Sequence, residues 1–198
     1  MEDLLIPAIA GQLRETAANL QAMSADAALH AAIATVAAAC IAALRQGNKL
    51  LFAGNGGSAS DAQHLAGELI SRFHYDRPGL PALSLSTDTS VLTAIGNDYG
   101  YEHLFARQIE ALGNVGDVFV GISTSGRSPN IVKALQTARA KGLLTVGLTG
   151  RSGGQLPTLC DHCLQVPSDS TPRIQEGHIA IGHTICLLIE QQLFPRDA

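Results

Sequence analysis

From Lys49 onward, short apolar stretches alternate with loops rich in glycine or serine and with segments of helical periodicity. Alternation of this kind indicates βαβ units, in which parallel strands form a sheet and helices cover both faces. Ligands of such sheets bind beyond the carboxyl ends of the strands. The sequence therefore predicts an α/β fold with its site at that edge. The expected strands are residues 49–53, 81–85, 117–123, 143–150 and 162–167, and the expected helices are residues 58–72, 89–100, 130–142 and 173–193.

Residues 1–47 precede this pattern and show helical periodicity twice, with a break near Met23. Ser24 or Asp26 is the expected N-cap of the second helix, and Gly47 is expected to close it. The second helix has alanine around much of its circumference, which favours close packing by neighbours on several sides. We expect one domain over residues 1–198, with residues 1–47 as a helical extension used in oligomerisation.

Composition excludes several classes of partner. Of the 198 residues, 46% are hydrophobic and 15% charged, and the net charge is −4, with lysine and arginine scattered along the chain. A nucleic-acid surface needs clustered basic residues, so none is expected. The acidic start of the chain is unlike a secretory signal. The alanine-rich second helix is only weakly hydrophobic, so no membrane span is expected and the cytoplasm follows.

The loop "ISTSGRSPN", residues 122–130, joins an expected strand to an expected helix. Its four hydroxyl side chains surround the positive end of the helix dipole: Ser123, Thr124, Ser125 and Ser128. Backbone N–H groups and hydroxyls at such a point bind an anion without lysine. Serines also cap helices, but this density exceeds what a cap needs. We therefore predict a phosphate site, and a nucleotide is disfavoured because neither GxxxxGK[ST] nor GxGxxG is present.

The stretch "GNGGS" follows the first expected strand and has two interpretations. Its glycines allow a ligand to approach the backbone, or they serve only a tight strand-to-helix turn. Polar side chains beside them favour contact with a substrate. The residues concerned are Gly54, Asn55, Gly56, Gly57 and Ser58.

Two helices carry side chains that can bind a metal ion. His64 and Glu68 are four residues apart on the first of these helices and therefore share a face, although a solvated His–Glu hydrogen bond has the same spacing. On the closing helix the candidates are Gln175, Glu176, His178 and His183. Helical spacing brings Glu176 nearly into line with His183, so geometry alone favours Glu176 over Gln175.

Four segments together are similar to the phosphoheptose isomerase family of sugar isomerase (SIS) domain proteins: "GNGGSASDAQHLAGEL", "LSTDTSVLTAIGNDYG", "GISTSGRSPNI" and "RIQEGHIAIGH". The resemblance covers nearly the full chain. It implies a flavodoxin-like three-layer αβα sandwich with two extra N-terminal helices, assembled as a homotetramer with sites between neighbouring chains. It also implies one Zn²⁺ per subunit, held by His64, Glu68, Gln175 and His183, in place of the Glu176 that spacing favours.

The same resemblance assigns a substrate site. Its positions are Asn55, Gly56, Gly57, Asn97, Asp98, Ser123, Thr124, Ser125 and Ser128, to which we add Ser58, Glu68 and Gln175. Arg127 stands where many relatives are expected to have a small neutral residue, which would alter the strength of phosphate binding. Asp98 also suits a helix-ending turn.

The activity implied is the interconversion of sedoheptulose 7-phosphate and D-glycero-D-manno-heptose 7-phosphate through an enediolate. It is the first step towards the ADP-heptose or GDP-heptose precursors of lipopolysaccharide or capsule. We expect Glu68 to act as the base and His183 as the acid/base partner. The alternative is a non-catalytic SIS-fold protein that associates with the replication initiator, which would not need both side chains. A sugar-phosphate sensor would carry a DNA-binding segment, and none is visible in the first 47 residues.

Other polar residues receive weaker assignments. Asp61 and Gln63 are further site candidates, and Asp169 is expected to be a loop or cap residue. His74 and His103 are assigned nothing. The two cysteines of "CDHC" have the spacing of a zinc or redox site, but no second CxxC is present. We therefore expect the cysteines to be reduced thiols without a function in zinc binding or redox chemistry. The cysteines are Cys40, Cys160, Cys163 and Cys186.

Overall fold

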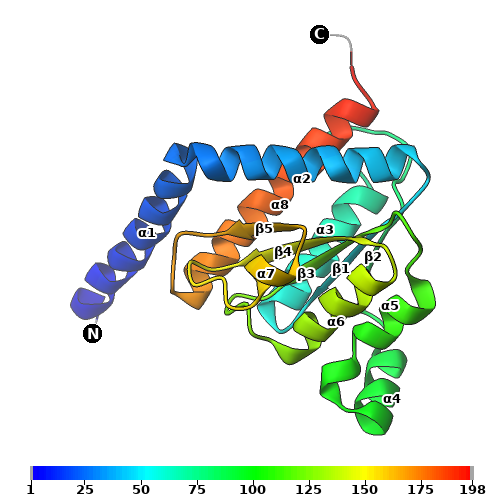
Figure 1. The fold of residues 1–198 in the computed structure, drawn as a ribbon. Coiled ribbons are helices and arrows are strands. Elements are labelled where there is room, and N and C mark those ends of the chain that lie inside the picture. The colour runs from blue at the N-terminus through cyan, green and yellow to red at the C-terminus, as the bar shows by residue number, and fades with distance from the viewer. Residues whose placement is uncertain (1, 197–198) are drawn as a thin grey trace.

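The computed structural model describes residues 2–196, and two long helices come first. They are α1 (Glu2–Ala25) and α2 (Ala27–Arg45), which leave their junction in different directions (Figure 1). Asp26 separates them, and its carboxylate accepts hydrogen bonds from the amides of Ala28 (2.9 Å) and Leu29 (3.0 Å). Gly47 follows α2 with a φ of 81°, which favours glycine. Both boundary predictions are confirmed, with Asp26 rather than Ser24 as the cap.

Five parallel strands form the sheet, in the order β2-β1-β3-β4-β5. Their bounds are β1 (Leu50–Gly54), β2 (Ala82–Ser84), β3 (Val118–Ile122), β4 (Leu144–Thr149) and β5 (His162–Gln165). This is the flavodoxin-like order, in which ligands bind at the switch point between β1 and β3. Gly54 pairs with Ile122 there, so the glycine and serine loops leave the sheet side by side.

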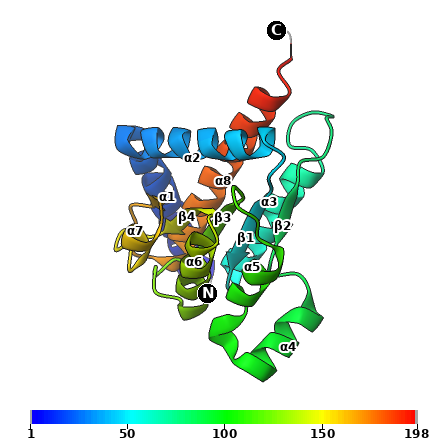
Figure 2. The ribbon, with the colours of Figure 1, turned by 45° about the vertical axis from the view of Figure 1, so that its right-hand side comes forward.

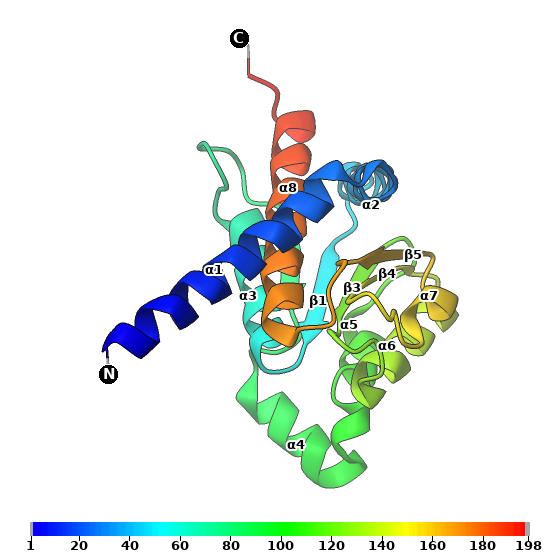
Figure 3. The same cartoon turned by 90° about the vertical axis from the view of Figure 1, so that its left-hand side faces the viewer.

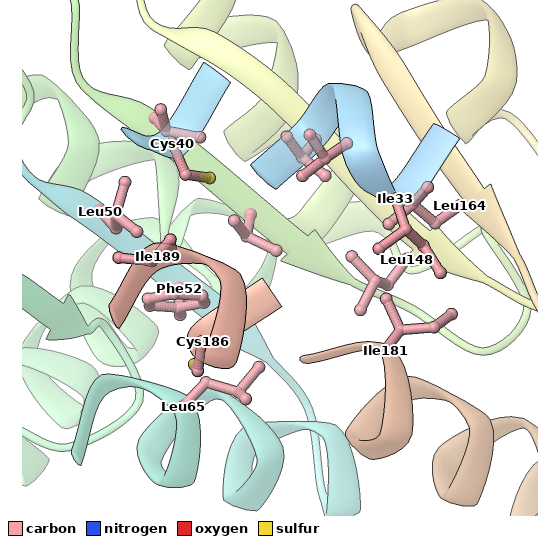
Figure 4. Close-up of a cluster of buried hydrophobic side chains, with 14 of the residues drawn as sticks. Ile33, Cys40, Leu50, Phe52, Leu65, Leu148, Leu164, Ile181, Cys186 and Ile189 are labelled. Carbon is pink, nitrogen blue, oxygen red and sulfur yellow. The ribbon is translucent and has the colours of Figure 1, made fainter. Parts of the chain in front are cut away.

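Three helices cover one face of the sheet: α2, α3 (Gly57–Ile70) and α8 (Thr171–Leu193). Figure 3 shows α3 and α8 running alongside each other in this layer. Alternate strand residues such as Leu50, Phe52 and Leu148 point into it, where they meet Cys40 of α2 and Ile189 of α8 (Figure 4). Burial of this apolar cluster fixes the layer that carries His64, Glu68 and His183.

The opposite face is covered by shorter elements. They are α4 (Thr89–Tyr99), the 3₁₀ turn Tyr101–His103, α5 (Ala106–Leu112), α6 (Pro129–Ala140) and α7 (Leu156–Leu159). Leu51 and Phe119 of the sheet pack here against Ile131 and Leu135 of α6. The predicted three-layer α/β fold is confirmed, although α5, α7 and the 3₁₀ turn were not predicted. In Figure 2, α4 lies apart from the other helices, at the edge beyond the strand ends.

Helix α2 corrects one expectation. By length and composition, its 19 residues are apolar enough to cross a membrane, contrary to the prediction that no stretch qualifies. The core helix of a soluble protein passes the same test. Here Val36 and Cys40 are buried against α8 and the sheet. About a third of the apolar stretch of α2 is buried within the described chain.

His178 of α8 is fully buried next to Thr149 of β4. Desolvation lowers the pKa of His178 to about 4, although the backbone of Thr149 acts in the other direction and raises it. The unfolded chain takes up this proton near the ordinary pKa of 6.5. Stability is therefore lost as pH falls from that value towards 4. We expect His178 to cost about 2 kcal/mol of unfolding free energy at about pH 5 relative to about pH 7.

Urea unfolding of the parent chain and of His178→Leu at both pH values measures this cost. The variant should lose less stability on acidification, by the same ~2 kcal/mol. Equal losses in the two chains would contradict the prediction.

Candidate active site

The switch point between β1 and β3 is bridged by a pair of asparagine side chains. Asn55, directly after β1, donates to Asn130 Oδ1 (2.9 Å), and Asn130 of α6 donates back to Asn55 Oδ1 (2.8 Å). Tyr101 adds a third contact, because its hydroxyl donates to Asn55 Oδ1 (3.0 Å). Asn130 is buried, so its amide needs these partners. These hydrogen bonds thus fix the position of the glycine loop after β1 relative to the start of α6, which follows the serine loop.

The serine loop differs from an ordinary helix cap. Ser128 occupies the N-cap position of α6 but makes no side-chain hydrogen bond to the helix amides. Its hydroxyl lies 2.9 Å from Ser123 Oγ instead. Ser125 Oγ accepts from the amide of Arg127 (3.2 Å). The first amides of α6 are therefore not capped by the Ser128 side chain, which is compatible with the predicted phosphate site.

Glycines let this loop pack against its neighbour. Gly126 has a φ of 64°, and a Cβ there would lie 2.0 Å from the carbonyl oxygen of Gly153. The amide of Gln155 in turn donates to the Gly126 carbonyl (2.8 Å). Beside this contact is a polar cleft of about 190 Å³, lined in part by Thr124, Arg127 and Arg151. The unexpected Arg127 thus faces the same cleft as Thr124.

The start of α3 approaches α8 closely. Gly56 has a φ of 55°, and a Cβ on Gly57 would lie 2.5 Å from Nε2 of Gln175. The side chain of Gln175 therefore rests directly on the glycine loop. The turn interpretation of "GNGGS" is confirmed by the φ of Gly56, and contact of this loop with a substrate stays a prediction.

His64, Glu68 and His183 converge between α3 and α8. His64 Nε2 lies 3.2 Å from Glu68 Oε1 and 2.8 Å from His183 Nε2. Ligand atoms of all three residues lie within 4.8 Å of one another. The side chain of His64 is 48% exposed and that of Glu68 is 22% exposed, so the cluster is open to a small molecule.

A glycine on α8 allows this convergence. A Cβ on Gly182 would lie 2.5 Å from Cδ2 of Leu65, so the two helices touch beside His64 and His183. A larger residue at position 182 would require either the Leu65 side chain or α8 itself to move.

The cluster fits a metal ion by the chemistry of its donors. Two imidazole nitrogens and one carboxylate oxygen are ligands that Zn²⁺ prefers, and three protein ligands leave a position for substrate. The Gln175 side chain lies against Gly57 at the start of α3, about two turns before His64, so its predicted place as a fourth ligand stays a prediction. A possible His/Glu/His metal site is what the described residues establish.

Glu176 is not part of this cluster, contrary to the preference from helical spacing. Its Oε1 lies 2.9 Å from Arg173 Nη2, one turn earlier on α8. Arg173 also donates to the carbonyl oxygen of Gln12 (2.5 Å) and to Thr16 Oγ1. The ion pair draws Glu176 towards α1, away from α3.

The remaining candidates are less closely associated. Asn97 and Asp98 are exposed on α4, and the Asn97 amide donates to Asp98 Oδ1 (2.7 Å). Asp61 is half-buried one turn before His64, and burial raises its pKa while His64 opposes the shift. Gln63 is exposed, and Asp169 pairs with Arg151 (3.5 Å) in the loop before α8.

Two residues near the site were not predicted from sequence, Asn130 and Tyr101. Asn130 lay inside the "SPN" of the serine loop, so its place after the phosphate serines was the available signal. Tyr101 had no such signal. The Cys160 and Cys163 thiols are free and half-buried, and burial raises their pKa values to about 12 and about 11, so thiolate chemistry is disfavoured.

The fold and the comparisons agree on a class. Residues 13–150 match the family model of the SIS domain, which defines a SIS domain protein. The phosphoheptose isomerase of Burkholderia pseudomallei strain 1710b is 57% identical over 197 residues, which cover 100% of both chains. That of Aneurinibacillus thermoaerophilus is 61% identical over 174 residues, 88% of each chain.

A solved structure is similar throughout. The phosphoheptose isomerase of Neisseria gonorrhoeae superposes with a TM-score of 0.89 at 40% identity, covering 94% of this chain and 99% of that one. The present chain belongs to the phosphoheptose isomerase family.

Proposed function

We propose that this protein interconverts sedoheptulose 7-phosphate and D-glycero-D-manno-heptose 7-phosphate. The observation that carries the proposal is the convergence of Glu68 and His183 from two helices, 115 positions apart in the chain. A non-catalytic SIS-fold binding protein has no need of this pair, so the alternative is not favoured. The family relationship supports the same activity.

Each end of the substrate has its own residues in this proposal. The hydroxyls of Ser123, Ser125 and Ser128 and the α6 dipole hold the phosphate, which positions the other end of the sugar. Glu68 takes the proton that moves between C1 and C2, and His183 donates to or accepts from the two oxygens. Asn55, Gly56, Gly57, Asn97, Asp98 and Thr124 are proposed contacts of the sugar. Ser58, also predicted as a contact, is buried at 3% exposure in the first turn of α3.

His64, Glu68, Gln175 and His183 are the proposed ligands of one Zn²⁺ per subunit. A bound cation would polarise the sugar oxygens as a Lewis acid or hold the site in shape. Bonding to the cation would then fix the tautomers of His64 and His183.

We also propose a homotetramer with residues 1–47 at its interfaces. In support, α1 presents exposed apolar side chains, among them Ile6, Ile9 and Leu13. The free cysteines suit a reducing compartment, and the cytoplasm is the proposed location.

The test is incubation of the purified chain with sedoheptulose 7-phosphate, with and without prior removal of metal by a chelator. We expect an aldose product, a lower rate after chelation, and recovery when Zn²⁺ is returned. Folded, zinc-supplied protein that forms no aldose would contradict the activity. An unchanged rate after proven loss of metal would contradict the role of zinc alone.

A further inference from the structure

The loop that follows α3, residues 71–81, meets α8 in a buried ion pair. Arg77 Nε lies 3.1 Å from Glu190 Oε1, and the two side chains are 2% and 0% exposed. Burial of two charges costs more than their attraction returns unless further hydrogen bonds satisfy both groups. The other partners of Arg77 and Glu190 therefore show what the pair holds in place.

Glu190 organises the start of the loop. Its Oε1 accepts from the amide of Phe73 (2.9 Å) and its Oε2 from the amide of His74 (2.8 Å). Burial alone would raise the pKa of Glu190, but the two amides and Arg77 outweigh it and lower the pKa. Glu190 is thus an anion whose two oxygens are both bonded to this loop.

Arg77 holds the end of α3. Its Nη2 donates to the carbonyl oxygen of Glu68 (2.8 Å), and its Nη1 donates to that of Leu69 (2.6 Å). The last carbonyls of a helix have no partner within the helix. One guanidinium therefore fixes the backbone of Glu68 itself, in a fork that lysine cannot reproduce.

The same contacts reach His183 from the other helix. Glu190 lies seven residues, about two turns, after His183 on α8. The Phe73 ring, held by Glu190 through its amide, lies 5.5 Å from the His183 ring centroid. Figure 3 shows the loop rising beside the C-terminal half of α8, where the Tyr75 hydroxyl donates to the carbonyl of Phe194 (2.8 Å).

We propose that Arg77 and Glu190 are positioning residues for the isomerase site. The pair locks the last turn of α3 against α8 and so sets the placement of Glu68 relative to His183. This inference rests on the proposed function, because it takes Glu68 and His183 as the reacting groups. The pair acts through the backbone of α3 and through the loop of residues 71–81.

The test compares Glu190→Gln and Arg77→Lys with a matched control, Asp117→Asn. Asp117 is also a buried carboxylate with a basic partner: it is 1% exposed and lies 2.6 Å from Nζ of Lys49, whose side chain is 25% exposed. It also accepts from the amides of Lys49 and Asn114. It lies just before β3, and its partners Lys49 and Asn114 belong neither to the proposed site nor to the loop of residues 71–81.

We expect kcat of the first two variants to fall about 10- to 100-fold with KM nearly unchanged, because groups that orient ligands and reacting atoms carry effects of this size. Zn²⁺ titration of metal-free protein should show about tenfold weaker binding. All three variants should have a lower Tm than the parent chain, by similar amounts. Asp117→Asn should nevertheless keep the parent kcat and Zn²⁺ affinity. Arg77→Lys, which keeps the charge, remains informative if Glu190→Gln does not fold.

Two outcomes separate the two proposals. If kcat and Zn²⁺ affinity fall no further in these variants than in Asp117→Asn, the pair is only structural and the positioning role is overturned. A parent chain that folds and binds Zn²⁺ but does not isomerise overturns the proposed function instead. In that case the Zn²⁺ titrations still test the pair.

Discussion

Glu68→Gln is expected to lower kcat at least a hundredfold. Glutamine has nearly the same shape as glutamate but cannot accept a proton, and general base catalysis contributes about 10²- to 10⁴-fold. The carboxylate also lies 3.2 Å from His64 Nε2, so its loss should weaken Zn²⁺ binding as well. The measurement is kcat together with metal content after dialysis against a trace of Zn²⁺.

His183→Ala should likewise lower both kcat and metal content, since Nε2 of His183 lies 2.8 Å from Nε2 of His64 in the same cluster. Glu176→Gln is the matched control, because Glu176 is the neighbouring carboxylate on α8 and pairs with Arg173 instead. It should retain metal and turnover. Full activity of Glu68→Gln or His183→Ala would refute the assignment, and loss of metal in Glu176→Gln would restore the ligand that helical spacing favours.

Gly126→Ala is expected to lower kcat/KM at least a hundredfold through the phosphate site. The new Cβ would lie 2.0 Å from the Gly153 carbonyl oxygen and 3.0 Å from the Gly154 Cα, and backbone atoms cannot move aside as a side chain can. The φ of 64° adds about 1–2 kcal/mol of strain for a residue with a Cβ. The loop must therefore open, which displaces the hydroxyls that position the substrate.

Gly47→Ala separates this effect from strain alone. Gly47 has a similar φ of 81°, but a Cβ there meets nothing within 4 Å. Its variant should lose only the conformational cost, about 1–2 kcal/mol of unfolding free energy, and keep the parent kcat/KM. If Gly126→Ala keeps the parent kcat/KM for sedoheptulose 7-phosphate, the serine loop is not where the phosphate binds.

The sequence was sufficient for most of the fold because each strand and long helix carries its own periodic signal. The five predicted strands and the helices carrying His64 and His183 are all found, with ends shifted by a few residues. The missed elements are short: α5 spans seven residues and α7 spans four. Segments of that length contain too few turns for a period to be recognised, and their form depends on packing against α6 and β4.

The site was only partly accessible for a related reason. The i,i+4 spacing gave His64 and Glu68, because it lies within one helix. The approach of His183 depends on how α3 and α8 meet at Gly182 and Leu65, which spacing along either helix does not describe. Spacing along α8 also favoured Glu176 wrongly. Glu176 is paired with Arg173, which bonds to α1, and the pattern of residues along one helix does not reveal such a contact. Arg77 and Glu190 are 113 residues apart and had no sequence signal.

The helix that carries Glu68 lies on one face of the sheet, and the helix that begins at the serine loop lies on the other. If one sugar phosphate binds to both as proposed, it has to extend from one face of the sheet to the other, and rigid backbone sets the distance between its phosphate and its carbonyl end. The site would then select substrates by the length of the sugar chain. A sugar phosphate with fewer carbons, bound through its phosphate to the serine hydroxyls, would not reach the Glu68 carboxylate with its carbonyl end.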